Sequence, residues 1–317
     1  MRRILVTGAS GFVGGHLLPA LRVAFPGAAL VAAGPAAAPG GWDEQVPLDL
    51  DRPQDAAAAA VAARPDAVIH LAARAAVAES FRDPLGTWRA NLLGTLALAE
   101  AVREAAPEAL FLLASSAEVY GLSFRDAALP LAEDAPLRPA NPYAASKAAA
   151  DLALGEMALR GLRAVRMRPF NHAGAGQSEA FVVSAFARQV ALIAAGRQEP
   201  VIRAGALDRW RDFLDVTDVC AGYVAVLREA ARIEPGAVFN LASGTPRHVG
   251  GILDELCRMA GIAPRVEAAA GLMRSTDVAR TEGDWRRARD ALGWEPRVPW
   301  NATLAAVLAD WRARIGP

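Results

Sequence analysis

A tyrosine and a lysine stand four positions apart in this chain, at Tyr143 and Lys147. Residues with this spacing share one face of a helix, so the two side chains would lie next to each other. A phenol has an ordinary pKa of about 10, and a nearby ammonium group favours its ionised form. The pair could therefore exchange a proton with a bound substrate near neutral pH. Lys147 is the only lysine in the chain, since the rest of the Lys and Arg total of 34 is arginine.

Two hydroxyl side chains, Ser115 and Ser116, end the apolar run that begins at Leu110. Such a run predicts a strand, and hydroxyls at the carboxyl end of a strand can bond a substrate oxygen. The alternative is an ordinary serine turn. This segment thus supplies candidate partners for a reacting oxygen beside the tyrosine.

A glycine-rich loop follows the first apolar run of the chain. Gly8 can take the positive φ of a tight turn. At Gly11 a missing Cβ would let a pyrophosphate approach, and at Gly14 it lets the next helix pack on the strand. The N–H groups of that helix's first turn would then face the phosphates. The loop predicts a dinucleotide site formed by Gly8, Ser10, Gly11, Phe12, Val13 and Gly14.

These residues need a scaffold, and alternating patterns along the chain predict one. Apolar runs predict strands at 4–7, 28–33, 45–48, 67–71, 110–115, 162–167 and 237–241. Helical patterns lie at 13–25, 53–63, 84–105, 143–160 and 217–230. This alternation predicts an α/β fold of the Rossmann type, a doubly wound parallel sheet with helices on both faces. Ligands bind such sheets beyond the carboxyl ends of the strands.

Further candidate cofactor contacts follow the third and fourth predicted strands. Asp49 could bond an adenine amino group or only solvate its loop, and His70 is expected to be a hydrogen-bonded core histidine. Asn91 within the helix 84–105 needs a partner, either in the backbone or in the active site. Neither an acidic residue nor an arginine follows the second predicted strand, so NADH and NADPH both remain open. The contacts predicted in these segments are Asp49, Leu50, Leu71, Ala72, Ala73 and Asn91.

Composition limits the classes of partner and compartment. The chain has 317 residues, of which 53% are hydrophobic, and its formal net charge is zero. This charge balance gives no reason to expect nucleic acid or an anionic membrane as a partner. The glycine loop begins before a signal-peptide apolar region could form, and the two cysteines suit a reducing, cytoplasmic setting. The four histidines are scattered, and no metal site is predicted.

The glycine loop, Ser116 and the Tyr143/Lys147 pair resemble the extended short-chain dehydrogenases/reductases, and the resemblance covers nearly the whole chain. It implies that Tyr143 is the general acid/base, that Lys147 tunes it, and that Ser116 bonds the reacting oxygen. It also implies that NADPH or NADH contacts Tyr143 and Lys147, and that the substrate is a nucleotide sugar.

Three runs in the second half carry a closer resemblance: Asn-His-x-Gly-x-Gly-Gln from Asn171, Phe-Val-Val from Phe181 and Arg-x-x-Asp-Val-x-Arg from Arg274. They look most like those of the GDP-4-keto-6-deoxymannose reductases, which make GDP-rhamnose. This implies a GDP-linked 4-keto-6-deoxy sugar whose diphosphate is held by Arg211 and Arg274, unless these are ordinary surface arginines. Ala173, Ala175 and Ser184 depart from the family pattern and leave the exact sugar open. The implied substrate contacts are Asn171, Val182, Arg188, Arg211 and Arg274.

Glu118 keeps a second activity open. In the related 4,6-dehydratases a glutamate at this place removes the C5 proton of the sugar, so Glu118 is a further candidate catalytic residue. However, Ala117 stands where glucose-type dehydratases have an aspartate. Mannose-type dehydratases carry Gln-Asp in the first glycine loop, where this chain has Gly11-Phe12-Val13. A C4 epimerase is another alternative, as is a cofactor-binding regulator without turnover.

The resemblance also implies a division into domains and an assembly. We expect an NAD(P)-binding domain at 1–167 plus 208–241, and a smaller, discontinuous α/β substrate domain at 168–207 plus 242–317. The helix 143–160 has a face of small residues, which permits close helix contact. In this family it often pairs with the helix 84–105 in a four-helix dimer interface, so a homodimer is expected.

Overall fold

The computed structural model describes residues 1–128, 130–269 and 278–316. Within these ranges, the largest sheet has seven strands in the order β10-β6-β5-β4-β1-β2-β3. All neighbours in it run parallel. The order reverses between β1 and β4, so a ligand crevice is expected above their carboxyl ends. The strands are β1 (Arg3–Thr7), β2 (Ala29–Gly34), β3 (Glu44–Pro47), β4 (Ala67–His70), β5 (Leu110–Ala114), β6 (Arg163–Pro169) and β10 (Ala237–Leu241).

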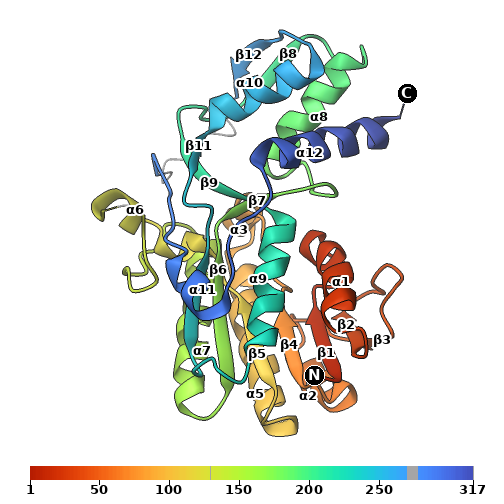
Figure 1. Ribbon diagram of the computed structural model, residues 1–317, viewed down its shortest axis with the longest axis vertical. Helices are drawn as coiled ribbons and strands as arrows, with labels where there is room; N and C mark the ends of the chain where they lie inside the picture. The colour runs from red at the N-terminus through yellow and green to blue at the C-terminus, as the bar shows by residue number, and fades with distance from the viewer. Residues whose placement is uncertain (129, 270–277, 317) are drawn as a thin grey trace.

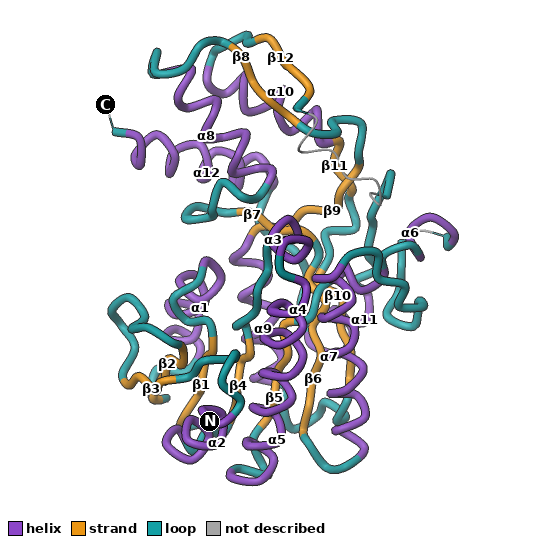
Figure 2. Tube along the Cα trace, turned by 180° about the vertical axis from the view of Figure 1, so that it is seen from behind, coloured by secondary structure: helices purple, strands orange, loops and turns teal. Residues whose placement is uncertain are grey.

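Helices cover both faces of this sheet, so the predicted fold class is confirmed (Figures 1 and 2). One apolar cluster joins the sheet to α1 (Phe12–Ala24), α9 (Val216–Arg228) and α11 (Arg286–Leu292). A second joins the opposite face to α2 (Gln54–Ala63), α5 (Thr95–Ala105) and α7 (Pro142–Leu159). The alternating sequence produces these layers because each strand buries apolar side chains on both of its faces.

The start of α7 is fixed by local sequence. The Asn141 side chain accepts a hydrogen bond from the Ala144 N–H at 2.8 Å, which satisfies one of the free N–H groups of the first turn. Pro142 occupies the first helical position, where its missing N–H costs nothing. The helix that carries Tyr143 and Lys147 therefore begins one residue before the predicted start.

The predicted helix 84–105 is interrupted. A short α4 (Pro84–Trp88) leads into η1 (Arg89–Gly94), a stretch of π-helix, before α5 begins. An additional short helix, α3 (Val77–Arg82), precedes them. Two more short helices, η2 (Ala117–Tyr120) and α6 (Ser123–Asp126), follow β5. π-helical turns arise where an extra residue is inserted in a helix, and they occur often at functional sites.

A smaller body lies beyond the carboxyl ends of the large sheet, at the top of Figure 1. Its apolar cluster is formed mainly by α8 (Val182–Ala194), α10 (Val249–Ala260) and α12 (Trp300–Ile315). The strands β8 (Val201–Ala204) and β12 (Arg265–Ala268) pair in parallel beside these helices. The division into two domains remains a prediction.

A three-stranded sheet lies between the two bodies, in the order β11-β9-β7 (Figure 1). Its strands are β7 (Asn171–Ala173), β9 (Trp210–Asp215) and β11 (Pro246–His248). The sequence prediction places 210–215 with the larger domain, whereas this strand pairs with β7 and β11. Among the described residues, no helix is long and apolar enough to span a bilayer.

Candidate active site

Tyr143 and Lys147 lie one turn apart on α7, and both reach toward the end of β5. Lys147 is only 4% exposed, and its Nζ donates a hydrogen bond to the backbone oxygen of Ala114. A side-chain hydrogen bond joins Tyr143 to Ser116, two residues further along. The predicted triad of Ser116, Tyr143 and Lys147 is thus assembled at one strand end, with its cation away from solvent.

The electrostatics of this triad differ from the sequence expectation in one respect. Burial raises the pKa of the Tyr143 phenol to about 12; the Ser116 hydrogen bond opposes this rise, and the charge of Glu118 adds to it. Lys147 was expected to lower the phenol pKa, but burial dominates in this structure. Burial also lowers the pKa of the Lys147 ammonium to about 8, against the attraction of the Asp151 carboxylate. Near neutral pH the site therefore holds a protonated phenol beside a cation.

Asp151, one turn beyond Lys147 on α7, was not predicted from the sequence. It is fully buried, and Arg168 donates to its two carboxylate oxygens at 2.9 Å each. The Ser115 hydroxyl donates to the same carboxylate at 2.6 Å. Burial raises the pKa of Asp151, but the bonds from Arg168 and Ser115 outweigh it and leave the pKa below its ordinary value. The spacing of Asp151 from Lys147, four residues, is the signal that could have identified it.

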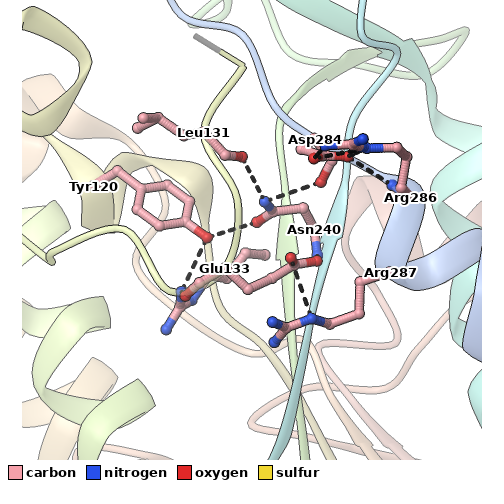
Figure 3. A network of polar contacts seen from close by, with 8 residues as sticks. Tyr120, Leu131, Glu133, Asn240, Asp284, Arg286 and Arg287 are labelled. Atoms are coloured by element: carbon pink, nitrogen blue, oxygen red, sulfur yellow. Dashed lines mark hydrogen bonds and ion pairs between the residues drawn. The ribbon is translucent and has the colours of Figure 1, made fainter. Parts of the chain in front are cut away.

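A network of polar contacts continues from Arg168, and Figure 3 shows its part around Tyr120, Asn240 and Glu133. Arg168 Nη1 donates to the Tyr120 hydroxyl at 2.9 Å, and this hydroxyl donates to Asn240 at 2.7 Å. The Asn240 backbone N–H donates to Glu133 at 2.8 Å, whose second oxygen pairs with Arg287 at 3.5 Å. Buried polar groups need partners of this kind. These contacts link β6 and η2 to β10 and α11.

The backbone conformation of the glycine loop is suited to binding the phosphates of a dinucleotide. Gly8 has a φ of +68°, and a Cβ there would come within 2.8 Å of the Ala72 nitrogen. At Gly14 a Cβ would lie 2.5 Å from the Ala9 oxygen. The first turn of α1 has neither a capping side chain nor an acidic residue, so its N–H groups keep their capacity for an anion. Ser10 and Gly11 are exposed at the tip of this loop, and Phe12 and Val13 begin the helix.

His70 connects the end of β1 to Thr95, the first residue of α5. Thr95 Oγ1 donates to the Asn91 carbonyl at 2.8 Å; its one proton is then used, so His70 Nε2 must donate to it, at 2.9 Å. His70 Nδ1 consequently accepts the Thr7 hydroxyl at 2.7 Å. Thr7 in turn accepts from the Ala72 N–H at 3.1 Å. Burial lowers the pKa of His70 to about 3, which agrees with a neutral ring and confirms the expected core histidine.

Asn91 finds its partner mainly in the backbone. Its Oδ1 accepts from the Arg74 N–H at 2.8 Å, and its Nδ2 donates to the Arg74 oxygen at 3.1 Å. The same Nδ2 donates to Ser146 Oγ on α7 at 3.0 Å. Asn91 therefore holds the chain immediately after Leu71, Ala72 and Ala73 against the helix that carries the tyrosine.

Three further predicted site residues, Asp49, Leu50 and Glu118, lie in segments that follow strands of the large sheet. Asp49 Oδ1 accepts from the Asp51 N–H at 3.0 Å, a bond within its own loop, and Leu50 lies against the π-helix where Gly94 leaves room. Glu118 is half-buried, and its Oε2 accepts from Asn141 Nδ2 at 3.3 Å. Glu118 thus lies at the start of α7, close enough to Tyr143 to influence the phenol.

The predicted substrate residues come from the middle sheet and from α8. Asn171 and Arg211 lie on β7 and β9, Val182 begins α8, and Arg188 pairs with Glu179 at 2.8 Å. Arg274 lies outside the described residues. None of these placements tests the predicted roles, but they put the first two residues on one sheet beyond β6.

The glycine loop contacts the segment that follows β6. The Phe12 ring stacks on His172 with centroids 6.2 Å apart, and His16 Nε2 donates to the Ala175 oxygen at 2.7 Å. The predicted cofactor and substrate segments are therefore neighbours, as a transfer between two bound molecules requires.

Comparisons with known proteins agree with this architecture. The profile of the NAD dependent epimerase/dehydratase family matches residues 4–242. GDP-6-deoxy-D-mannose reductase of Pseudomonas aeruginosa is 38% identical over 317 residues, covering 99% of this chain and 98% of the relative. A solved structure of RMD from Pseudomonas aeruginosa complexed with NADPH has a TM-score of 0.85 at 37% identity, over 99% of this chain and 100% of that one. UDP-glucose 4-epimerase of Streptomyces lividans is 33% identical over 78% of this chain and 74% of its own. With a glycine loop and a Ser-Tyr-Lys triad in the matched region, the chain belongs to the NAD dependent epimerase/dehydratase family, the extended short-chain dehydrogenases/reductases.

Proposed function

We propose that this chain reduces the C4 ketone of GDP-4-keto-6-deoxymannose to give GDP-rhamnose, with NADPH as the reductant. The relative named GDP-6-deoxy-D-mannose reductase spans nearly the whole chain, and the RMD structure contains NADPH. The observation that carries the proposal is the Tyr143 phenol, held by Ser116 and protonated at neutral pH, on the same helix as a buried lysine. A reduction needs a proton donor of this kind at the start of the reaction.

The residues of the chain divide the chemistry between them. When bound, the nicotinamide supplies a hydride to the C4 carbon. Ser116 and Tyr143 bond the carbonyl oxygen, and Tyr143 delivers its proton to this oxygen as it becomes an alkoxide. Lys147 stabilises the phenolate that remains and would bond the ribose hydroxyls of the bound cofactor. Asp151, held by Arg168, keeps Lys147 charged despite its burial.

The binding roles are assigned by the same reasoning. The backbone of Gly8 to Gly14 would hold the pyrophosphate, and Leu71 to Ala73 would contact the cofactor. Arg211 and Arg274 hold the substrate diphosphate, with Asn171, Val182 and Arg188 around the nucleotide. We assign the cofactor to the larger body and the nucleotide sugar to the smaller one.

The test is a purified-protein assay with GDP-4-keto-6-deoxymannose and NADPH. We expect NADPH absorbance to fall with substrate, and NMR to identify GDP-rhamnose as the product. Tyr143→Phe should lower kcat by about 10²- to 10⁴-fold, because the proton donor is lost, while NADPH binding persists. Elimination from GDP-mannose, or epimerisation of UDP-glucose, without net cofactor consumption would overturn the reductase assignment. Binding of NADPH without turnover of any of these would identify a regulator.

We further propose a homodimer that forms through the face of α3, α4, η1 and α7, in the reducing cytoplasm, where both cysteines stay as thiols. Large apolar side chains are exposed on this face: Phe81 (55%), Leu85 (76%), Leu93 (53%) and Leu152 (60%). Exposed apolar residues that gather on one face favour a protein partner. A second copy of the chain is the partner that the family resemblance implies.

A further inference from the structure

An arginine that the sequence analysis did not select, Arg247, lies directly opposite Arg211. The strands β11 and β9 run antiparallel, and their register pairs these two residues. Directly opposite residues of an antiparallel pair project from the same face with their Cβ atoms about 5 Å apart. Two like charges in this position normally destabilise a sheet. An anion bound between them would reverse the sign of that interaction.

The Arg247 guanidinium makes no hydrogen bond or salt bridge with the described residues that would give it a structural role. Arg247 is half-buried, and its Nε is buried without a hydrogen-bond partner. Within the described residues, its one ring contact is with Trp300, 4.9 Å from the ring centroid. Buried donors are rarely left without acceptors in folded proteins.

Asp212 forms no hydrogen bond or ion pair with Arg247. Burial lowers the pKa of the Arg247 guanidinium, and the charge of Asp212 opposes this effect. Asp212 neighbours Arg211, but successive residues of a strand point to opposite faces. Asp212 is fully buried and already accepts bonds from Ser243, Gly244 and Gly283, at 2.6–3.2 Å. Asp212 therefore lies on the opposite face of β9 and leaves the Nε of Arg247 without an acceptor.

Packing holds the Arg247 guanidinium in place before any ligand arrives. Trp300 opens α12, and it stacks on Phe213 of β9 with ring centroids 5.4 Å apart. Phe213 follows Arg211 by two residues and so shares its face. It also pairs in register with Asn171, a predicted substrate contact on β7. Arg247 is thus fixed by an aromatic ring on the sheet face that carries Arg211 and Asn171.

We propose that Arg247 binds the diphosphate of the nucleotide sugar together with Arg211, as a second arginine on the same sheet face. The inference rests on the proposed function, because it takes a nucleoside diphosphate sugar as the substrate. A diphosphate has enough oxygens to accept forked bonds from two guanidinium groups. Arg247 is accordingly a binding residue, with no part in proton transfer.

The test compares GDP with GMP, measured by calorimetry on the full chain saturated with NADPH. Arg247→Met removes the charge and the donors but keeps a long apolar side chain against Trp300. We expect GDP to bind about 10- to 100-fold more weakly, and GMP to lose less than about threefold because one phosphate is gone. Arg247→Lys should restore part of the GDP affinity. Arg203→Met, at an exposed arginine of β8, is the matched control and should leave both constants unchanged.

The outcomes separate this inference from the proposed function. If wild type binds GDP and Arg247→Met binds it equally well, the inference fails and the function stands. An equal loss for GDP and GMP would mean that Arg247 only supports the structure, which also overturns the inference. If wild type binds UDP in place of GDP, with the same effect of Arg247→Met, the inference stands and the choice of base fails. If neither nucleoside diphosphate binds, both fail.

Discussion

Lys147 loses its proton in a pH range where an ordinary lysine keeps it, because burial lowers its pKa to about 8. We expect kcat for the ketone reduction to fall as the pH rises past about 8, since a neutral amine no longer stabilises the Tyr143 phenolate. Lys147→Arg stays charged at these pH values, so its profile should lack this alkaline limb. Its kcat should be lower throughout, because the flat fork fits the site poorly. The measurement is kcat against pH at saturating NADPH for both proteins.

Unfolding would not produce this alkaline loss. Between the folded pKa near 8 and the ordinary value of 10.5, the unfolded chain holds the Lys147 proton more tightly than the folded chain. The contribution of Lys147 to the free energy of unfolding therefore rises with pH across this range. Activity should fall while this contribution rises. A parallel loss of activity and of folded protein would contradict the assignment.

Glu118 distinguishes the reductase from a dehydratase. Its charge raises the pKa of Tyr143, so Glu118→Gln should lower that pKa and change kcat for reduction by less than about tenfold. If Glu118 instead removed a sugar proton, the same substitution would cost about 10²- to 10⁴-fold in elimination. Rates with the keto sugar and with GDP-mannose, measured on one preparation, decide between the two roles. Glu108→Gln, at an exposed position before β5, controls for the change in net charge.

Among the secondary-structure elements, β1, β4 and α5 are joined through His70, which bonds Thr7 and Thr95. His70→Leu should lower the free energy of unfolding by about 2–4 kcal/mol, because the Thr7 and Thr95 hydroxyls each lose a partner. The folded pKa near 3 lies below the ordinary 6.5, so wild type should lose stability as the pH falls through this range, and the variant should lose less. Urea unfolding at several pH values measures both effects. A difference between the two proteins that stayed constant with pH would rule out a buried neutral His70.

The sequence predicted the elements well where local pattern decides them. The strands of the large sheet are runs of apolar residues, and α7 has an asparagine cap followed by proline. The helix 84–105 was predicted as continuous, because its pattern is helical throughout. Asn91 lies within the π-helical interruption, and its amide bonds both backbone groups of Arg74. Such a contact between separate segments leaves no periodic signal.

Prediction of the candidate site from the sequence has the same limit: residues placed by contacts between distant segments are missed. The glycine loop, Ser116, Tyr143 and Lys147 were identified because each has a local motif or a fixed spacing. The fork between Arg168 and Asp151 depends on β6 lying beside α7, and no local spacing indicates that contact. Arg247 has no motif at all, because its position opposite Arg211 is set by the pairing of two strands more than thirty residues apart.

At the scale of the whole molecule, the exposed apolar face over α3, α4, η1 and α7 decides the assembly. Leu152 on α7 is 60% exposed, and a charge there would have to be desolvated in a dimer interface. We expect wild type to sediment as a dimer at micromolar concentration and Leu152→Glu to sediment as a monomer. Val23→Glu is the matched control, because Val23 is 82% exposed on α1, which covers the opposite face of the sheet. If wild type were a monomer, or if both variants remained dimers, this face would not be the interface. Tyr143 and Lys147 lie on the same α7 helix. The activity of a monomeric Leu152→Glu therefore also shows whether the triad needs the partner to hold its helix.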